Sequence, residues 1–412
     1  MLVLTCILMQ AQTFELTGEF RFRPEFRNGY KQLPDSNSDA AYFVSQRNRI
    51  GLHYTSDKYE SQFTIQEGRV WGDQMFKSSK ASVGVLEAWV NVKLCDSISL
   101  KMGRQPMLFS NQRFFSVNNW SQTGQMHDAA MLQLKSGRKK LFFAQAFNQK
   151  AENTFGTDYL NDAAEIKNNY KTLSFLRYEQ KAGKFDFAAM AYADGFQDLN
   201  GEALYVRSTQ GAEVKYAIKK LIFSGMGYFQ TGHNISGSEL AAWYAGAEAE
   251  YKTEKFSAKL GGEILSGNDI SSEKYEQFIP QYASNHSFNG YMDYFTNYAT
   301  CTSGTGLIDT YLKATYKYTK VHSVALDYHY FATQQATVTG GASIDQFLAH
   351  EVDLTWKMAF AKDFNVCVGY SILSGSATME LIQNRTAAGL SHWAYVMLEL
   401  KPTFLKYVFE KK

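Results

Sequence analysis

The 412-residue chain lacks any run of eighteen or more apolar residues, so no segment of it is expected to cross a membrane as a helix. Proline is scarce, with 5 residues, and cysteine is scarcer still, with 4. The cysteines, Cys6, Cys95, Cys301 and Cys367, show neither close pairing nor the spacing of a metal site. These absences argue against a helical membrane protein, a disulfide framework and a zinc domain.

An excess of one charge is also missing, because 42 basic residues balance 40 acidic ones to a formal net charge of +2. That balance gives no support to nucleic-acid binding. We find no phosphate-binding glycine loop and no catalytic Cys-His signature, and we expect no cofactor and no metal. Asp35, Asn37 and Asp39 have the spacing that begins a calcium loop, but Ala40 stands where such a loop needs glycine. An ordinary polar loop is the favoured interpretation, and the sequence does not decide whether calcium binds there.

Aromatic residues, in contrast, are abundant. They form 15% of the chain, with 26 Tyr and 30 Phe, while the mean hydropathy is −0.33. Many aromatics with a polar average are typical of a β-barrel that faces lipid on one side and water on the other. A single barrel domain over residues 12–412 is therefore expected. Residues 1–11 are apolar, lack a basic start and are interpreted as a signal peptide, possibly truncated, with a disordered tail as the alternative.

Strict alternation near the N-terminus predicts the first strand. Phe20 and Phe22 share one parity with other apolar residues, whereas Glu19, Arg21 and Arg23 share the other. Similar runs recur along the chain, and we predict an all-β, antiparallel, up-and-down transmembrane barrel of about 18 strands, with 16 as the alternative. The predicted strands are 14–27, 42–54, 60–70, 83–94, 98–108, 128–135, 140–149, 170–180, 184–194, 204–217, 221–232, 240–252, 256–265, 306–318, 322–332, 348–358, 364–373 and 391–401.

The connections between these strands alternate in length. Those after even-numbered strands are short, as at 95–97 and 181–183, whereas the longest, after an odd-numbered strand, runs from Ser266 to about Thr305. Short periplasmic turns and long extracellular loops are typical of a bacterial outer-membrane barrel. Eighteen strands enclose a water-filled lumen rather than one packed with side chains.

Alternation also predicts which residues line that lumen. A charge facing lipid at the bilayer midplane costs about 2–4 kcal/mol. The polar parity of each strand is therefore assigned to the channel, and it includes Arg47, Arg49, Lys313 and Asp353. Nine of the twelve arginines lie at or before Arg138, which predicts an arginine-rich wall that favours anions. The alternative is that these arginines pair with the lumenal carboxylates Glu15, Glu19 and Glu25 and only stiffen the wall.

Several motifs carry a family resemblance. Gly103-Arg104-Gln105, Asn111-Gln112-Arg113, Trp120, Gly124 and Asp128 follow one another in an order that resembles the alginate-export family of outer-membrane porins. Gln125 and His127 depart from the family's usual Arg and Phe. Further segments similar to the family, in sequence order, are Arg47-Asn48-Arg49, Arg69-Val70-Trp71-Gly72, Tyr228-Phe229-Gln230-Thr231-Gly232, Ser266-Gly267-Asn268-Asp269 and the loop from Asn285 to Phe295.

The resemblance implies an eighteen-stranded outer-membrane porin that passes an anionic uronate polymer through a basic conduit. Arg104 shares its parity with Leu100 and Met102, so a bulge or a strand end would have to turn it inward. The residues that the resemblance marks as lumenal or rim contacts are Arg21, Arg23, Arg47, Arg49, Arg69, Arg104 and Arg113.

The leading hypothesis is a passive channel, more readily monomeric than oligomeric, that contacts outer-membrane lipid, hydrophilic anionic solutes or polysaccharide, and periplasmic export partners. A barrel enzyme of lipase or protease type is the first alternative, but Asp327 and His329, on one strand, have no nucleophile at catalytic spacing. The second alternative is a plugged or structural barrel of a secretion complex, in which the loop from Ser266 to Thr305 folds inward. The sequence identifies neither the solute nor the direction of its passage.

Overall fold

The computed structural model describes residues 12–74, 83–159, 169–339 and 342–409. The predicted signal peptide, residues 1–11, lies outside the described residues. The wall of the molecule consists of β1 (Thr13–Asn28), β2 (Ala41–Thr55), β3 (Tyr59–Val70), β4 (Val83–Cys95), β5 (Ile98–Gln105), β6 (His127–Ser136), β7 (Lys139–Phe147), β8 (Thr172–Ala182), β9 (Phe185–Gln197), β10 (Leu204–Ile218), β11 (Leu221–His233), β12 (Glu239–Lys252), β13 (Phe256–Leu265), β14 (Leu307–Tyr316), β15 (His322–Ala332), β18 (Phe347–Ala361), β19 (Phe364–Gly375), β20 (Ser391–Leu400) and β21 (Thr403–Val408).

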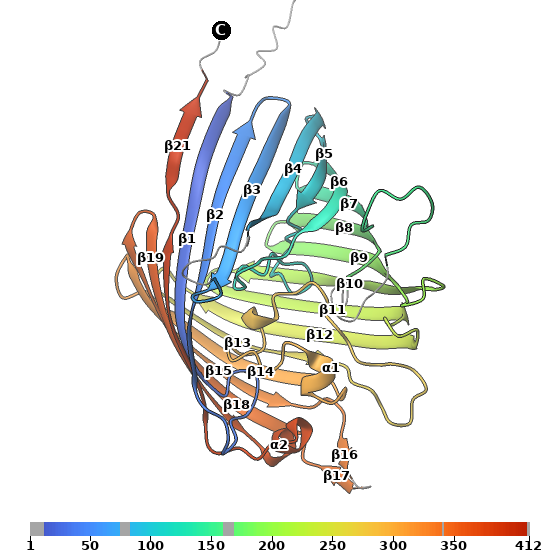
Figure 1. The fold of residues 1–412 in the computed structure, drawn as a ribbon, viewed down its shortest axis with the longest axis vertical. Coiled ribbons are helices and arrows are strands. Elements are labelled where there is room, and N and C mark those ends of the chain that lie inside the picture. Colours follow the sequence, from blue (N-terminus) through green and yellow to red (C-terminus); the bar gives the residue numbers. More distant parts are fainter. Residues whose placement is uncertain (1–11, 75–82, 160–168, 340–341, 410–412) are drawn as a thin grey trace, which may run out of the picture.

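These strands form one closed antiparallel sheet (Figure 1). Each strand pairs with its neighbours in sequence, and β1 closes the ring by pairing with β2 on one side and with β20 and β21 on the other. Closure leaves the barrel without the long free sheet edges that lipid could not satisfy. The predicted barrel of eighteen strands is confirmed, because β20 and β21 are two parts of one last strand.

The last strand differs from the prediction, which ended it at residue 401. It is interrupted at Pro402, which has no N–H to donate to a ladder. The Pro402 carbonyl still accepts from the Gly18 amide at 2.9 Å, and pairing resumes with Thr403 opposite Thr17. Proline therefore breaks the strand locally without ending it.

The connections follow the predicted alternation. Short turns join β2 to β3, β4 to β5 and the later pairs at the end of the barrel where Thr13 lies opposite Val408. The longest connection, 266–306, joins β13 to β14 and contains η1 (Asn285–Ser287) and α1 (Tyr298–Cys301). Other long loops carry the hairpin of β16 (Thr337–Thr339) and β17 (Ala342–Ile344) and the helix α2 (Ala377–Gln383), none of which was predicted. No helix in the described ranges is long and apolar enough to span a bilayer.

The two faces of the wall separate as alternation predicts. Leu326 and Leu354 lie opposite one another on β15 and β18 and are 51% and 46% exposed on the outward face. Their neighbours Asp327 and Asp353, also opposite one another, point into the barrel and are buried. Since only lipid can cover so many exposed apolar side chains, the outward face is the membrane face.

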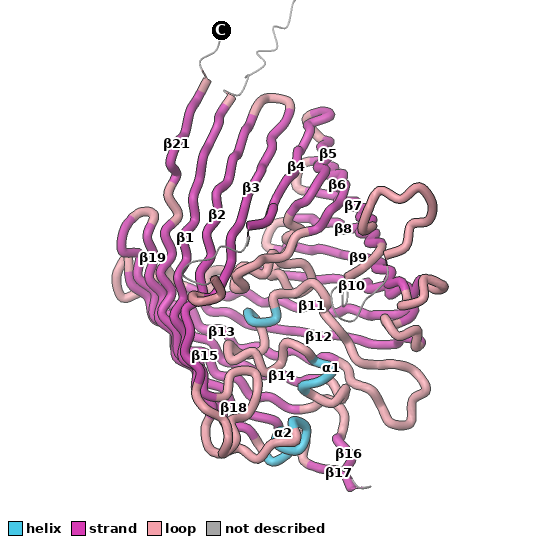
Figure 2. The backbone as a smooth tube through the Cα atoms, viewed as in Figure 1, coloured by secondary structure: helices cyan, strands magenta, loops and turns pink. Residues whose placement is uncertain are grey.

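Two loops turn into the barrel and bury its lumenal wall. The strand β5 ends at Gln105, three residues before the prediction, and from Pro106 the chain enters the interior as the loop 106–126. The loop 266–306 follows β13 and starts at the same rim of the barrel, and Figure 2 shows both loops within the enclosed space. Phe115 and Tyr282 form an isolated parallel bridge between the two loops and stack with ring centroids 5.2 Å apart. We call residues 106–126 the first inward loop and 266–306 the second.

Candidate functional site

The lumenal face of β1 and β2 concentrates positive charge. Register places five arginines and three glutamates on this face. Glu19 pairs with Arg47 and with Arg49, at 3.5 Å to the latter. Glu25 pairs with Arg23 at 2.7 Å, and the remaining carboxylate of the face binds Lys406 instead of an arginine. The five arginines are Arg21, Arg23, Arg27, Arg47 and Arg49.

Arg21 has no carboxylate within ion-pair distance among the described residues. It lies directly opposite Arg47 on β2, and both side chains are almost completely buried. The pairing of lumenal arginines with glutamates, considered as the alternative from sequence, therefore holds for Arg23, Arg27, Arg47 and Arg49. Arg21 lies opposite Glu399 on β20 but forms no ion pair with it. Burying a cation without a counter-ion is costly unless hydrogen bonds replace its hydration.

Those hydrogen bonds come from the first inward loop. The Arg21 guanidinium donates to the carbonyl oxygens of Asn119, Trp120 and Ser121 at 2.6, 3.1 and 2.7 Å. Arg47 donates to two of the same carbonyls, those of Asn119 and Ser121, at 3.0 and 2.8 Å. Backbone oxygen atoms of residues 119–121 and the side-chain oxygen of Gln122 thus converge on adjacent guanidinium groups. We call this arrangement the arginine–carbonyl cluster.

Trp120 connects this cluster to the second inward loop. The Arg23 guanidinium lies 4.0 Å from the centroid of its ring, in cation–π contact. The indole also stacks on the His286 ring with centroids 4.1 Å apart. One aromatic side chain thereby holds the arginine wall and both loops together.

Arg113 is the main anchor between the loops and the wall. Its side chain is fully buried and forms an ion pair with Glu263 of β13 at 2.5 Å. It also donates to Asn289 at 3.3 Å and to the Tyr298 hydroxyl at 3.1 Å. Arg113 was predicted as a solute contact, and the structure places it within the packing of the two loops, out of contact with water.

Asp293 forms a second anchor, beside Tyr30 and Lys31 in the loop that follows β1. It accepts hydrogen bonds from the Tyr30 hydroxyl and pairs with His286 Nδ1 at 2.7 Å. Burial opposes ionisation of Asp293, but His286, Tyr30 and Lys31 outweigh this effect and lower the pKa of its carboxyl group below the usual value. The ionised carboxylate therefore stabilises the docked loop.

This anchor predicts loosening of the second inward loop in acid. Because the folded pKa of Asp293 is depressed, its contribution is complete above the ordinary Asp value, about 3.9, and is lost as the pH falls through the lower folded value. We expect protease cleavage within 266–306 to accelerate below about pH 3.9. Replacing Asp293 with asparagine should give rapid cleavage already at pH 7 and little further change in acid; an unchanged pH profile in that variant would contradict this role.

The sector from β12 to β18 carries several lumenal carboxylates. Lys313 pairs with Asp327 at 3.4 Å, while His329 pairs with Asp309 at 2.8 Å. The Asp327 and His329 pair noted in the sequence is therefore split between different partners, Lys313 and Asp309. Asp353 accepts from the Ser371 hydroxyl and is buried.

A cavity of about 290 Å³ remains between this sector and the second inward loop. Its lining combines the lysines Lys259 and Lys313 with Glu248, Tyr291 and Tyr311. Lys259 and Lys313 lie directly opposite one another, each beside a carboxylate. Water and polar groups can therefore occupy this part of the lumen, with charges of both signs.

Two of the predicted pore-lining residues point the other way. Arg69 lies opposite Gln46, which lies opposite Phe22, so register places Arg69 on the outward face. Its ion pair with Glu67, at 3.0 Å, replaces solvent there. Of the lumenal or rim contact that the resemblance implies for Arg69, register excludes the lumenal position, because the parity of β3 continues unbroken to Val70 against β2.

Arg104 is the second. No bulge interrupts the pairing of β5 with β6, so Arg104 keeps the outward parity of Met102 and lies opposite Asp128, to which it pairs at 3.1 Å. It is near the last residue of β5, where the strand leaves the membrane and a charge can reach water. The expected inward turn is not found.

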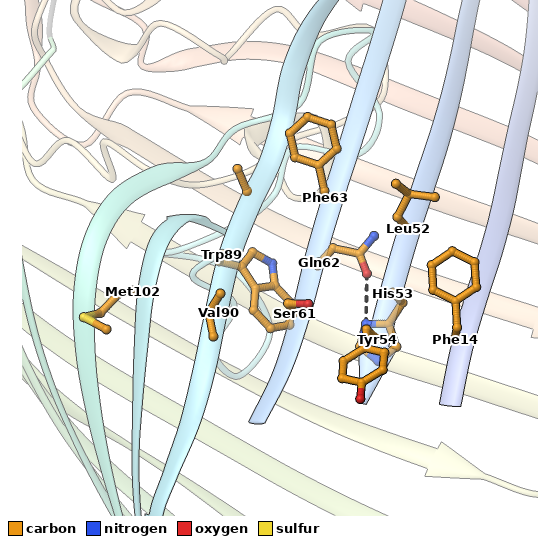
Figure 3. Close-up of a pocket in the computed structure, with 11 residues that line it drawn as sticks. Phe14, Leu52, His53, Tyr54, Ser61, Gln62, Phe63, Trp89, Val90 and Met102 are labelled. Atoms are coloured by element: carbon orange, nitrogen blue, oxygen red, sulfur yellow. Dashed lines mark hydrogen bonds between the residues drawn. The ribbon is translucent and has the colours of Figure 1, made fainter. Parts of the chain in front are cut away.

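A hollow of about 440 Å³ lies on the outer surface, away from the lumenal charges. Leu52, Phe63 and Met102 contribute outward side chains to its lining (Figure 3). His53 and Gln62 also border it and form a hydrogen bond of 3.0 Å with each other. Its apolar lining on the membrane face fits lipid rather than a hydrophilic solute.

Comparison with known proteins decides the family. A scan of protein families matches residues 13–386 to the family described as Alginate export. The chain belongs to this family. The predicted resemblance is thus confirmed over nearly the whole barrel, and the protein is an outer-membrane barrel of a family of transport porins, not of enzymes. A search of curated proteins found no match.

Solved structures support the same fold. The chain resembles OccAB1 of Acinetobacter baumannii with a TM-score of 0.65 and 12% identity, covering 95% of this chain and 97% of that one. It resembles OccK9 (OpdG) of Pseudomonas aeruginosa with a TM-score of 0.64 and 12% identity, covering 96% and 98%. At such low identity these similarities show the fold alone, a porin-like barrel.

Proposed function

We propose that this member of the alginate export family passes hydrophilic anionic solutes, with an acidic polysaccharide such as a uronate polymer as the leading candidate. The observation that carries the proposal is the surplus of arginine on the lumenal face of β1 and β2, five against three glutamates. A wall of one sign raises the local concentration of counter-ions and speeds their entry. Guanidinium groups also match the planar geometry of carboxylates.

The two accessible members of this wall are Arg27 and Arg49. Their side chains are 28% and 13% exposed, whereas Arg21 and Arg47 are covered by the first inward loop. Arg27 and Arg49 are therefore the groups that a solute in the lumen meets first. The family match supports a channel of this kind, and its description as Alginate export makes a uronate polymer the natural candidate.

A reversal potential across a salt gradient tests the proposal. We expect the purified protein in a planar bilayer to prefer chloride over potassium. Replacing Arg49 with glutamine should reduce that preference by about twofold, because a unit charge about 9 Å away in water contributes roughly 0.5 kcal/mol. Lys220 lies exposed in a turn and, replaced by glutamine, is the matched control that should leave the ratio unchanged. A wild-type preference for potassium would overturn the proposal.

Export of a polymer would add a requirement outside the barrel. A passive channel supplies no energy. A periplasmic partner would therefore have to deliver the polymer to the periplasmic end of the barrel, where both termini of the protein lie. Conductance measurements with the isolated barrel do not depend on such a partner, and the charge preference can be tested without it.

A further inference from the structure

The arginine–carbonyl cluster has the composition of an occupied anion site. Arg21 is buried with no carboxylate partner among the described residues, and Arg47 lies opposite it. Uncharged oxygens fill the hydrogen bonds of Arg21: three backbone carbonyls and the side-chain oxygen of Gln122. Arg47 pairs with Glu19 and donates its other hydrogen bonds to two of the same carbonyls and to the Asn119 side chain. A carboxylate adds opposite charge and can accept two parallel N–H···O bonds from one guanidinium, which a neutral carbonyl oxygen does not.

We propose that Arg21 and Arg47 form a binding site for one carboxylate group of a solute, and that residues 119–122 occupy this site until the solute displaces them. The inference rests on the proposed anion channel and adds to it a specific site and an autoinhibitory contact. A carboxylate supplies the missing negative charge, which the carbonyl oxygens do not. Displacement also removes part of the first inward loop from the lumen, so that arrival of the solute widens its own path.

The surroundings of the segment suit such movement. The side-chain hydroxyls of Ser121 and Thr123 bond to each other at 3.1 Å. The Thr123 carbonyl accepts from Gln66 of β3 at 2.6 Å, and Gln122 meets the wall at the side chains of Arg21 and Ser45. The deeper anchor of the same loop, Arg113, lies earlier in the chain and contacts different residues. For residues 119–122 to leave the arginines, the Trp120 ring must also separate from Arg23 and His286, whereas the Arg113 anchor of the same loop can stay docked.

A pair of engineered cysteines reports the position of the segment. A Cβ atom built on Gly68 would lie 3.6 Å from Cβ of Gln122, within the range that a disulfide requires. In a chain whose native cysteines are serine, Gly68→Cys with Gln122→Cys should therefore form a disulfide readily when the segment is docked. Each single substitution serves as the control for oxidation elsewhere.

The test compares the rate of disulfide formation with galacturonate, with neutral galactose and with no addition. At about ten times its Kd, galacturonate should slow the reaction by about tenfold, because it holds most of the population in the displaced form. Galactose should have no effect. Adding Arg21→Gln to the cysteine pair should abolish the galacturonate effect while the disulfide still forms. Equal rates in all three solutions would overturn the inference and leave the proposed anion preference, measured by reversal potential, standing or falling on its own.

Discussion

Replacing Arg113 with alanine should undock both inward loops and increase the single-channel conductance of the barrel. The substitution leaves the Glu263 carboxylate buried without its cation and removes the hydrogen bonds to Asn289 and Tyr298. Breaking a buried ion pair from one side costs about 3–5 kcal/mol. Since the wall itself does not depend on these contacts, the cost falls on loop docking. Planar-bilayer recordings and protease cleavage within 266–306 measure the effect.

Two variants separate this explanation from a general loss of structure. Arg138→Ala changes an exposed arginine in a turn and should behave as wild type. The double variant Arg113→Met with Glu263→Met removes both charges, and replacing a buried pair by apolar residues is often neutral. It should therefore restore much of the docking. Equal conductance in wild type and Arg113→Ala would show that Arg113 does not hold the loops.

The second large effect concerns the two faces of β15. Leu326→Lys places a charge on the membrane face and should destabilise the folded barrel by about 2–4 kcal/mol. Ala325→Lys, one residue away, places the same charge among the lumenal threonines Thr315 and Thr355 and should cost little. Unfolding in urea from phospholipid vesicles measures both. Similar destabilisation by the two substitutions would contradict the assignment of faces.

Period-two alternation was sufficient for the barrel because strand pairing is regular around the whole ring. The prediction failed where one local feature interrupts the pattern. Pro106 ended β5 early, and Pro402 divided the last strand without ending it. The hairpin β16–β17 and the helix α2 lie in loops, where no lipid face imposes alternation.

The site was only partly predictable for a different reason. Parity correctly placed Arg21, Arg47, Lys313 and Asp353 inside the barrel, but it carries no information about loops that fold back onto the wall. The partners of Arg113, which are Glu263, Asn289 and Tyr298, lie far from it in sequence. The motif that spans Asn289 was noted as part of the family resemblance, yet its contact with Arg113 depends on tertiary packing.

The family resemblance, and not parity, marked Arg69 and Arg104 as lumenal or rim contacts, and the register keeps both on the outward parity. Both lie near strand ends, where an arginine on the outward face can reach the water at the membrane boundary with its long side chain. The rule that charges avoid lipid therefore holds strictly only in the middle of a strand. Arg69 lies in the same outward row as Phe22, with Gln46 of β2 between them, and Arg104 shares the outward parity of Met102 on β5.

A single recording tests the central claim that this cylinder encloses water while lipid covers its outer face. Purified protein, folded as shown by its shift in electrophoretic mobility on heating, is added to a planar bilayer in potassium chloride. Discrete steps in current, larger in Arg113→Ala than in wild type, are the expected result. A folded barrel that inserts but passes no current, in wild type and in that variant alike, would contradict a continuous aqueous path.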